Sequence, residues 1–234
     1  MKRLFLAALA AASVSLPTLA LAESKTLDVA PFTGIDITSG ITAHVALGGA
    51  QSVVAESPDA EDLANLKYEV RNGVLRVSVD WSFWRLFDTH DRKIVLTIGA
   101  PALDTVLASS GASVDVASLG GDKLTLEASS GAYVKVLGAV GKSYRLETSS
   151  GAGLEVSGTC TDAQAESSSG ASVQAKSLAC ATVDAEASSG AHIEITATKT
   201  ISAESSSGAG ITVWGKPSVD HLETSSGGNV DFPG

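Results

Sequence analysis

Apolar and polar side chains alternate through most of the chain, and the tripeptide Ser-Ser-Gly interrupts the alternation at regular intervals. A period of two places every second side chain on one face of a β-strand, so the pattern predicts strands with one buried face. Successive interruptions lie 18 to 20 residues apart. Their glycines are Gly111, Gly131, Gly151, Gly170, Gly190, Gly208 and Gly227. So even a spacing indicates one structural unit per repeat.

Equivalent positions in the repeats form columns of similar residues. The positions three and five residues after the glycine are apolar, as in Val134 and Val136, and so is the position five residues before it, as in Leu126. Each unit therefore contains a strand, a Ser-Ser-Gly corner and a second strand. A unit of about 20 residues cannot bury its apolar face alone, but stacked units can. We predict an all-β fold, a right-handed parallel β-helix (a solenoid) with about 20 residues per coil, in which glycine allows the bend.

The repeats are regular over residues 101–234, whereas residues 23–100 predict irregular coils of the same domain. Within the irregular part, residues 58–67 predict a helical turn or two, because proline and acidic residues open the segment. The Asn72-Gly73 dipeptide predicts a tight reversal between two strands.

An aromatic insert at residues 80–93 breaks the alternation. It contains Trp81, Phe83, Trp84 and Phe87. These side chains could cap the apolar core, or they could contact a partner protein, a glycan or a membrane interface. The sequence leaves both alternatives open.

Residues 1–22 have the organisation of a secretory signal peptide. Lys2 and Arg3 precede an apolar stretch, and Ala20-Leu21-Ala22 supplies the small-residue cleavage site. No second segment is apolar and long enough to predict a membrane span. We therefore expect an exported protein, periplasmic or extracellular in a bacterium, whose mature part, residues 23–234, is a single β-helix domain.

The order of several short motifs resembles the bacterial family of putative auto-transporter adhesins with a head GIN domain. The resemblance covers about residues 30–232. Its motifs are Phe32-Thr33-Gly34-Ile35, Ser39-Gly40-Ile41, Asn72-Gly73-Val74-Leu75, the strand entry at Pro101 and the recurring Ser-Gly pairs. The resemblance implies an exported bacterial β-helix with no established biochemical activity.

A column of glutamates lies four residues before the glycine of each corner from the second repeat onward. Strand parity directs these side chains outward. The glutamate column consists of Glu127, Glu147, Glu166, Glu186, Glu204 and Glu223. It could be a solvated face that opposes aggregation, or a stripe that binds cations such as Ca²⁺. A polysaccharide-binding or polysaccharide-cleaving site is a third alternative.

Charge and histidine placement limit the partners, reactions and cofactors that the sequence predicts. The net charge of −10 argues against nucleic acid as a partner. No histidine column accompanies the repeated serines, so we assign no catalytic residue. The four histidines show no spacing typical of zinc sites, and we expect no cofactor apart from the calcium alternative. The sequence thus predicts a non-enzymatic binding or structural module of the envelope, with a glycan or a surface protein as candidate partner.

The two cysteines occupy the same place in neighbouring repeats. Cys160 lies ten residues before Gly170, and Cys180 lies ten residues before Gly190. Neighbouring coils bring such positions within the Cα separation that a disulfide requires, and an exported protein meets an oxidising compartment. We therefore predict a disulfide between Cys160 and Cys180, with two stacked free thiols as the alternative.

Overall fold

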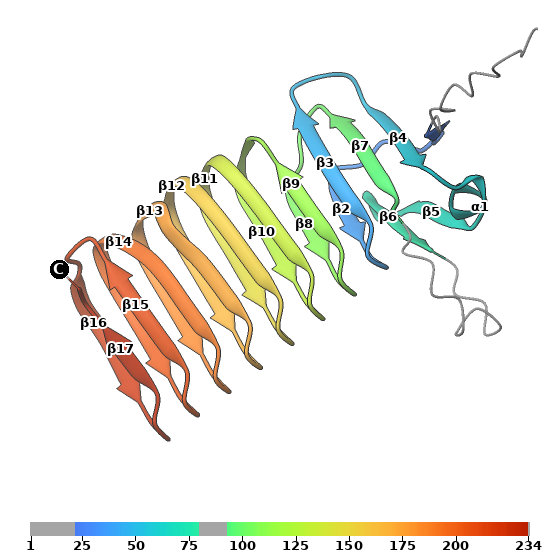
Figure 1. Cartoon of the computed structure of the whole chain (residues 1–234). Coiled ribbons are helices and arrows are strands. Elements are labelled where there is room, and N and C mark those ends of the chain that lie inside the picture. The colour runs from blue at the N-terminus through green and yellow to red at the C-terminus, as the bar shows by residue number, and fades with distance from the viewer. Residues whose placement is uncertain (1–21, 80–92, 234) are drawn as a thin grey trace, which may run out of the picture.

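The computed structural model describes residues 22–79 and 93–233. The predicted signal peptide, apart from Ala22, and the aromatic insert with Trp81, Phe83, Trp84 and Phe87 lie outside the described residues. The described strands stack along one axis as a β-solenoid (Figure 1). The parallel β-helix predicted from the repeat is therefore confirmed, with neighbouring coils in register at a spacing of about 20 residues.

The regular coils run from β8 to β17, and most of their pairings are parallel and in register. In the longer strands the return segment also pairs, so one strand passes from one corner to the next. These strands are β8 (Thr105–Ala108), β9 (Ser113–Val116), β10 (Leu119–Ala128), β11 (Tyr133–Thr148), β12 (Gly153–Ser167), β13 (Ser172–Ala187), β14 (His192–Ser205), β15 (Gly210–Trp214), β16 (Ser218–Thr224) and β17 (Asn229–Asp231).

The N-terminal part mixes parallel and antiparallel strands. Its elements are β1 (Glu23–Thr26), β2 (Gly34–Ile37), β3 (Thr42–Leu47), β4 (Ser52–Ser57), α1 (Ala60–Ala64), β5 (Leu66–Arg71), β6 (Val74–Val79) and β7 (Val95–Ala100). The expected helical turn is α1, which Asp59 caps by accepting a hydrogen bond from the backbone N–H of Glu61. The expected reversal joins β5 and β6, with positive φ at both Asn72 and Gly73.

The coils do not stack in the order in which they occur in the chain. Strand β2 pairs with both β6 and β8, and β3 pairs with both β7 and β9. The β2–β3 coil is therefore inserted between the later β6–β7 and β8–β9 coils (Figure 1). A repeat period alone predicts sequential stacking, so this insertion could not be anticipated from the sequence.

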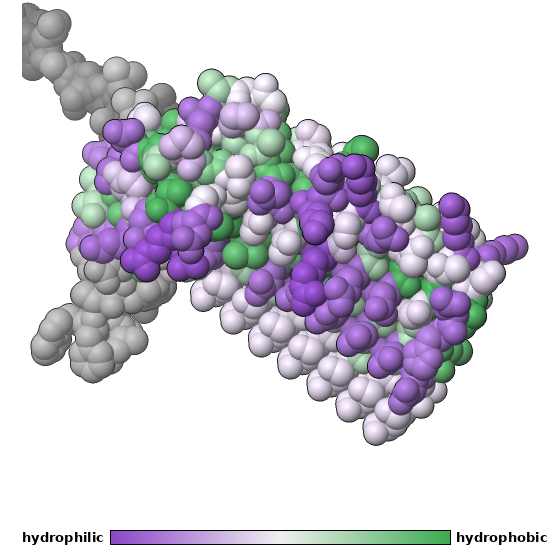
Figure 2. Space-filling model, turned by 180° about the vertical axis from the view of Figure 1, so that it is seen from behind, coloured by the Kyte–Doolittle hydropathy of each residue, from purple (hydrophilic) through white to green (hydrophobic). Residues whose placement is uncertain are grey.

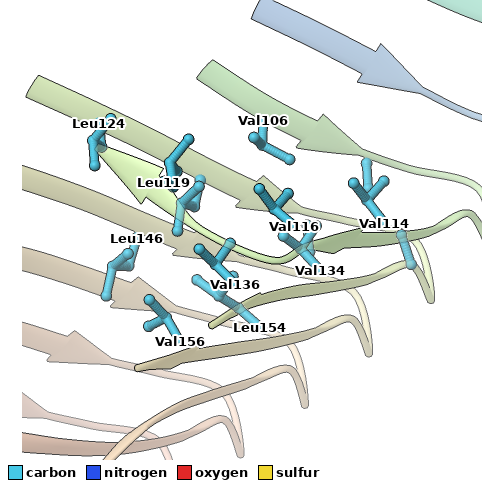
Figure 3. Packing of buried hydrophobic residues seen from close by; sticks show 14 of the residues in the cluster. Val106, Val114, Val116, Leu119, Leu124, Val134, Val136, Leu146, Leu154 and Val156 are labelled. Atoms are coloured by element: carbon cyan, nitrogen blue, oxygen red, sulfur yellow. The ribbon is translucent and has the colours of Figure 1, made fainter. Parts of the chain in front are cut away.

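The interior contains the apolar columns that the alternation predicts. Figure 3 shows side chains from successive coils, among them Val134, Leu146 and Leu154, packed inside the solenoid. These three are fully buried. Burial of one such side chain stabilises the fold by about 1.5–3 kcal/mol. Tyr144 also lies in the core, beside the small Ala163 of the next coil.

Each corner is a tight turn with two consecutive residues of positive φ. At one of them φ is 52° for Ser130 and 73° for Gly131, and the N–H of Ala132 donates to the carbonyl of Ser129 at 3.1 Å. This is the pattern of a type I′ turn. A Cβ atom at Gly131 would meet nothing within 4 Å, so its φ, and not steric clash, favours glycine. The N–H of Gly131 bonds to the carbonyl of Ser150, which joins neighbouring corners.

Candidate functional site

The glutamate column is continuous over six coils. The register pairs Glu127 with Glu147, Glu147 with Glu166, Glu166 with Glu186, Glu186 with Glu204, and Glu204 with Glu223. Leu107 occupies the equivalent place in the preceding coil and ends the column. The six carboxylates therefore follow one line parallel to the solenoid axis.

The column forms one side of a groove with a volume of about 310 Å³, here called the glutamate groove. Two further columns line it, one of small residues and one of corner serines. The small residues are Ala128, Thr148, Ser167, Ala187 and Ser205, and the serines are Ser149, Ser168, Ser188, Ser206 and Ser225. Figure 2 shows a stepped row of pale residues along one edge of the solenoid, with hydrophilic side chains gathered on the adjoining face.

The sequence predicted that these serines lie at corners and indicated no binding role for them. Each glutamate of the column lies two residues before the first serine of its corner. The glutamate and that serine therefore line the same groove. A hydroxyl pair also lies under the groove, where Thr148 Oγ1 and Ser167 Oγ are 2.7 Å apart and buried. The groove therefore offers acceptors from carboxylates and both donors and acceptors from hydroxyls.

Arg145 supplies a positive charge beside Glu147 and Glu166, in the N-terminal half of the glutamate column. Its guanidinium forms a salt bridge with Glu147 and lies 3.4 Å from Glu166 Oε1 through Nη2. It also donates to Gln164 Oε1 at 2.9 Å, and Gln164 in turn donates to Glu166. Arg145 therefore offsets the repulsion between two neighbouring carboxylates.

Glu186, in the middle of the column, has a different environment. Partial burial raises the pKa of its carboxyl, and the charges of Glu166, Asp184 and Glu204 raise it further. Among the described residues no salt bridge reaches Glu186. Glu147 and Glu166, by contrast, lie beside Arg145.

A histidine joins the column at its C-terminal end. His221 Nε2 lies 3.4 Å from Glu204 Oε1 and 3.8 Å from Glu223 Oε2. One ligand atom from each of the three residues falls within 4.8 Å of the others. The sequence spacing of the histidines did not indicate this group, because two of its members come from the last coil and the third from the coil before.

The cysteines lie outside the groove. Cys160 and Cys180 are direct partners in the pairing of β12 with β13, and a disulfide joins them. The pairing is the one expected from their shared place in the repeat. No helix within residues 22–79 or 93–233 is long and apolar enough to cross a membrane.

Comparison with known proteins identifies the family. The model of the family described as putative auto-transporter adhesin, head GIN domain, matches residues 31–217. The chain belongs to this family. The resemblance noted in the short motifs is thus confirmed, and the matched range covers both the inserted β2–β3 coil and most of the GIN-domain solenoid. No curated protein matches the chain.

Solved structures share the fold of the GIN-domain chain. A structure described as a putative adhesin from Bacteroides fragilis NCTC 9343 has a TM-score of 0.80 at 20% identity, covering 90% of this chain and 96% of that one. A putative adhesin from Parabacteroides merdae has a TM-score of 0.69 at 16% identity with the same coverage of both chains. A structure from Parabacteroides distasonis, described as a putative lipid binding protein, has a TM-score of 0.67 at 14% identity, again with the same coverage.

Proposed function

We propose that the protein is an exported, non-enzymatic, adhesin-like module of the bacterial envelope that binds a neutral glycan along the glutamate groove. One observation carries the proposal: carboxylates and hydroxyls line a single groove that runs past six coils. Sugar hydroxyl groups donate to carboxylates and exchange hydrogen bonds with serine hydroxyls. The same carboxylates repel polyanions, which favours uncharged sugars.

The shape of the groove suits an extended ligand. Its lining repeats with the coil, so a chain of similar units can make the same contacts more than once, and repeated contacts raise avidity. No aromatic side chain is among the described residues that line it, so recognition would use the polar edges of the sugars. The polar lining does not favour an acyl chain, although one structural neighbour is described as a lipid binding protein.

The alternative is a polysaccharide-cleaving protein. Glycoside hydrolysis needs two carboxyl groups with different roles, and neighbouring glutamates such as Glu166 and Glu186 supply a close pair with unlike surroundings. The repetition of glutamates in successive coils favours binding over cleavage, because hydrolysis needs one pair of carboxyl groups, whereas the column repeats the same neighbour relationship along the groove.

Binding to an array of neutral and acidic glycans tests the proposal. We expect neutral glycans to bind and the Glu166→Gln and Glu186→Gln variants to lose affinity, whereas Glu56→Gln, on β4 and outside the groove, retains it. Equal affinity in all variants would exclude the groove as the site. A reducing-end assay on the bound glycans distinguishes the alternative, since release of new reducing ends would show cleavage.

A further inference from the structure

We propose that Glu204, His221 and Glu223 form a binding site for a divalent transition-metal ion, with Zn²⁺ as its first candidate. The site shares Glu204 and Glu223 with the glutamate groove and adds His221, which does not line the groove. It also differs from a calcium stripe, which would use the carboxylates of the whole column.

Two of the three donor separations are close to those that a metal requires, and all three lie within 4.8 Å. His221 Nε2 lies 3.4 Å from Glu204 Oε1 and 3.8 Å from Glu223 Oε2. A tetrahedral zinc ion with bonds of about 2.0–2.1 Å holds neighbouring donor atoms about 3.4 Å apart. One ion can therefore contact all three side chains after small rotamer adjustments.

The register of the last coil places His221 beside the glutamates, just after a local irregularity of the sheet. The register between β14 and β16 pairs Ile201 with Val219 but Ser202 with His221, so Asp220 is an extra residue in the last coil. From Ser202 to Ser205 the register is regular, and His221 lies two residues before Glu223 on the same strand. Residues two apart in a strand share a face, so the imidazole lies on the same face as both carboxylates.

The donor set favours a transition metal over calcium. Imidazole suits zinc, copper and nickel, whereas Ca²⁺ takes six to eight oxygen ligands. The side chains of Glu204, His221 and Glu223 are 52%, 53% and 66% exposed, so an ion can reach them from solvent. Three protein ligands leave at least one coordination position for water or for a donor atom of a bound molecule.

An ion pair is the competing explanation for the geometry. Protonated His221 would offset the charges of Glu204 and Glu223, much as Arg145 does for Glu147 and Glu166. At this exposure such a pair contributes little to stability. The two explanations differ in what they predict for zinc, since only a metal site requires the neutral imidazole.

Isothermal titration of the purified chain with ZnCl₂ after chelator treatment tests the proposal. We expect one ion per chain with a Kd in the micromolar range, about −8 kcal/mol. His221→Ala and Glu204→Gln should each weaken zinc binding at least tenfold. His192→Ala, which removes another exposed histidine, and Glu127→Gln, at the far end of the column, should leave the affinity unchanged.

Three results would contradict the proposed zinc site. Zinc affinity that is unchanged in the His221→Ala variant would show that the imidazole is not a ligand. Equal weakening by Glu127→Gln would show diffuse binding along the column. A wild-type Kd above about 100 µM would show that the three groups form only an ion pair. Circular dichroism melting of each variant, and His221→Gln as a second substitution, distinguish loss of a ligand from loss of folding.

Discussion

Cys160 and Cys180 are direct partners on neighbouring coils, with their Cα atoms 4.5 Å apart and their sulfur atoms bonded. Replacing both by alanine should lower the free energy of unfolding by about 3 kcal/mol, because the bond closes a loop of about 20 residues in the unfolded chain. Chemical denaturation of the wild type and the double variant, without reductant, measures this difference.

Reduction supplies the control for the disulfide. Dithiothreitol should destabilise the wild type and leave the double variant unchanged, and thiol titration of the denatured, unreduced wild type should find no free thiol. Two titratable thiols in that sample would refute the bond between Cys160 and Cys180.

The second prediction concerns the raised pKa of Glu186. Its folded pKa lies above the unfolded value of 4.5, so protonation favours the native state. The stabilisation is fully present below pH 4.5 and is lost as the pH rises through the folded pKa. Glu186→Gln stays neutral throughout, and the variant should therefore melt at a higher temperature than the wild type at pH 7 and at a similar temperature at pH 4.

Glu56→Gln controls for the general effect of removing one negative charge, because Glu56 lies on β4, away from the glutamate column. A gain in Tm at pH 7 for both variants would attribute the effect to net charge. No gain for Glu186→Gln would contradict the raised pKa.

Calcium provides a third prediction, which concerns the whole column. If the carboxylates bind Ca²⁺, millimolar CaCl₂ should raise the Tm of the wild type more than NaCl of equal ionic strength. Glu166→Gln should reduce the difference, since it interrupts the column at its middle. An equal response to both salts would leave the column as a solvated face.

The two tyrosines of β11 allow a fourth prediction. Tyr144 is buried and its hydroxyl has no hydrogen-bond partner among the described groups, and burial raises its pKa to about 12. Tyr133 is partly exposed and donates to Glu155 Oε2 at 2.7 Å. Tyr144→Phe should therefore stabilise the protein by about 1 kcal/mol, whereas Tyr133→Phe should destabilise it by about the same amount. Equilibrium denaturation of both variants measures the sign, and destabilisation by Tyr144→Phe would indicate a partner for its hydroxyl.

The corners provide the fifth prediction. Gly170 has a φ of 71°, and a Cβ atom there would meet nothing within 4 Å, so Gly170→Ala should cost about 1 kcal/mol through the backbone alone. Gly120→Ala is the matched control, since its φ is not positive and its Cβ would make only an ordinary contact of 3.7 Å with Val140 O. Equal melting temperatures for the two variants would show that the corner tolerates a side chain.

The period of the repeat predicted much of the geometry, because each coil copies the position of the one before. It placed the six glutamates in one column and the two cysteines opposite each other. It could not predict departures from the period. The bulge at Asp220, for example, depends on local pairing. The positive φ at serines such as Ser130 likewise depends on the turn, which the motif alone does not specify.

The insertion of the β2–β3 coil makes the two ends of the solenoid respond differently to mechanical load. Tension at the C-terminal end detaches β17 and β16, each of which pairs with a single strand of the preceding coils. Tension at the N-terminal end, once β1 has left β4, must extract β2 and β3, each of which pairs on both edges. Two ladders must break for every strand removed there, so the N-terminal end resists extraction by tension more strongly than the C-terminal end does.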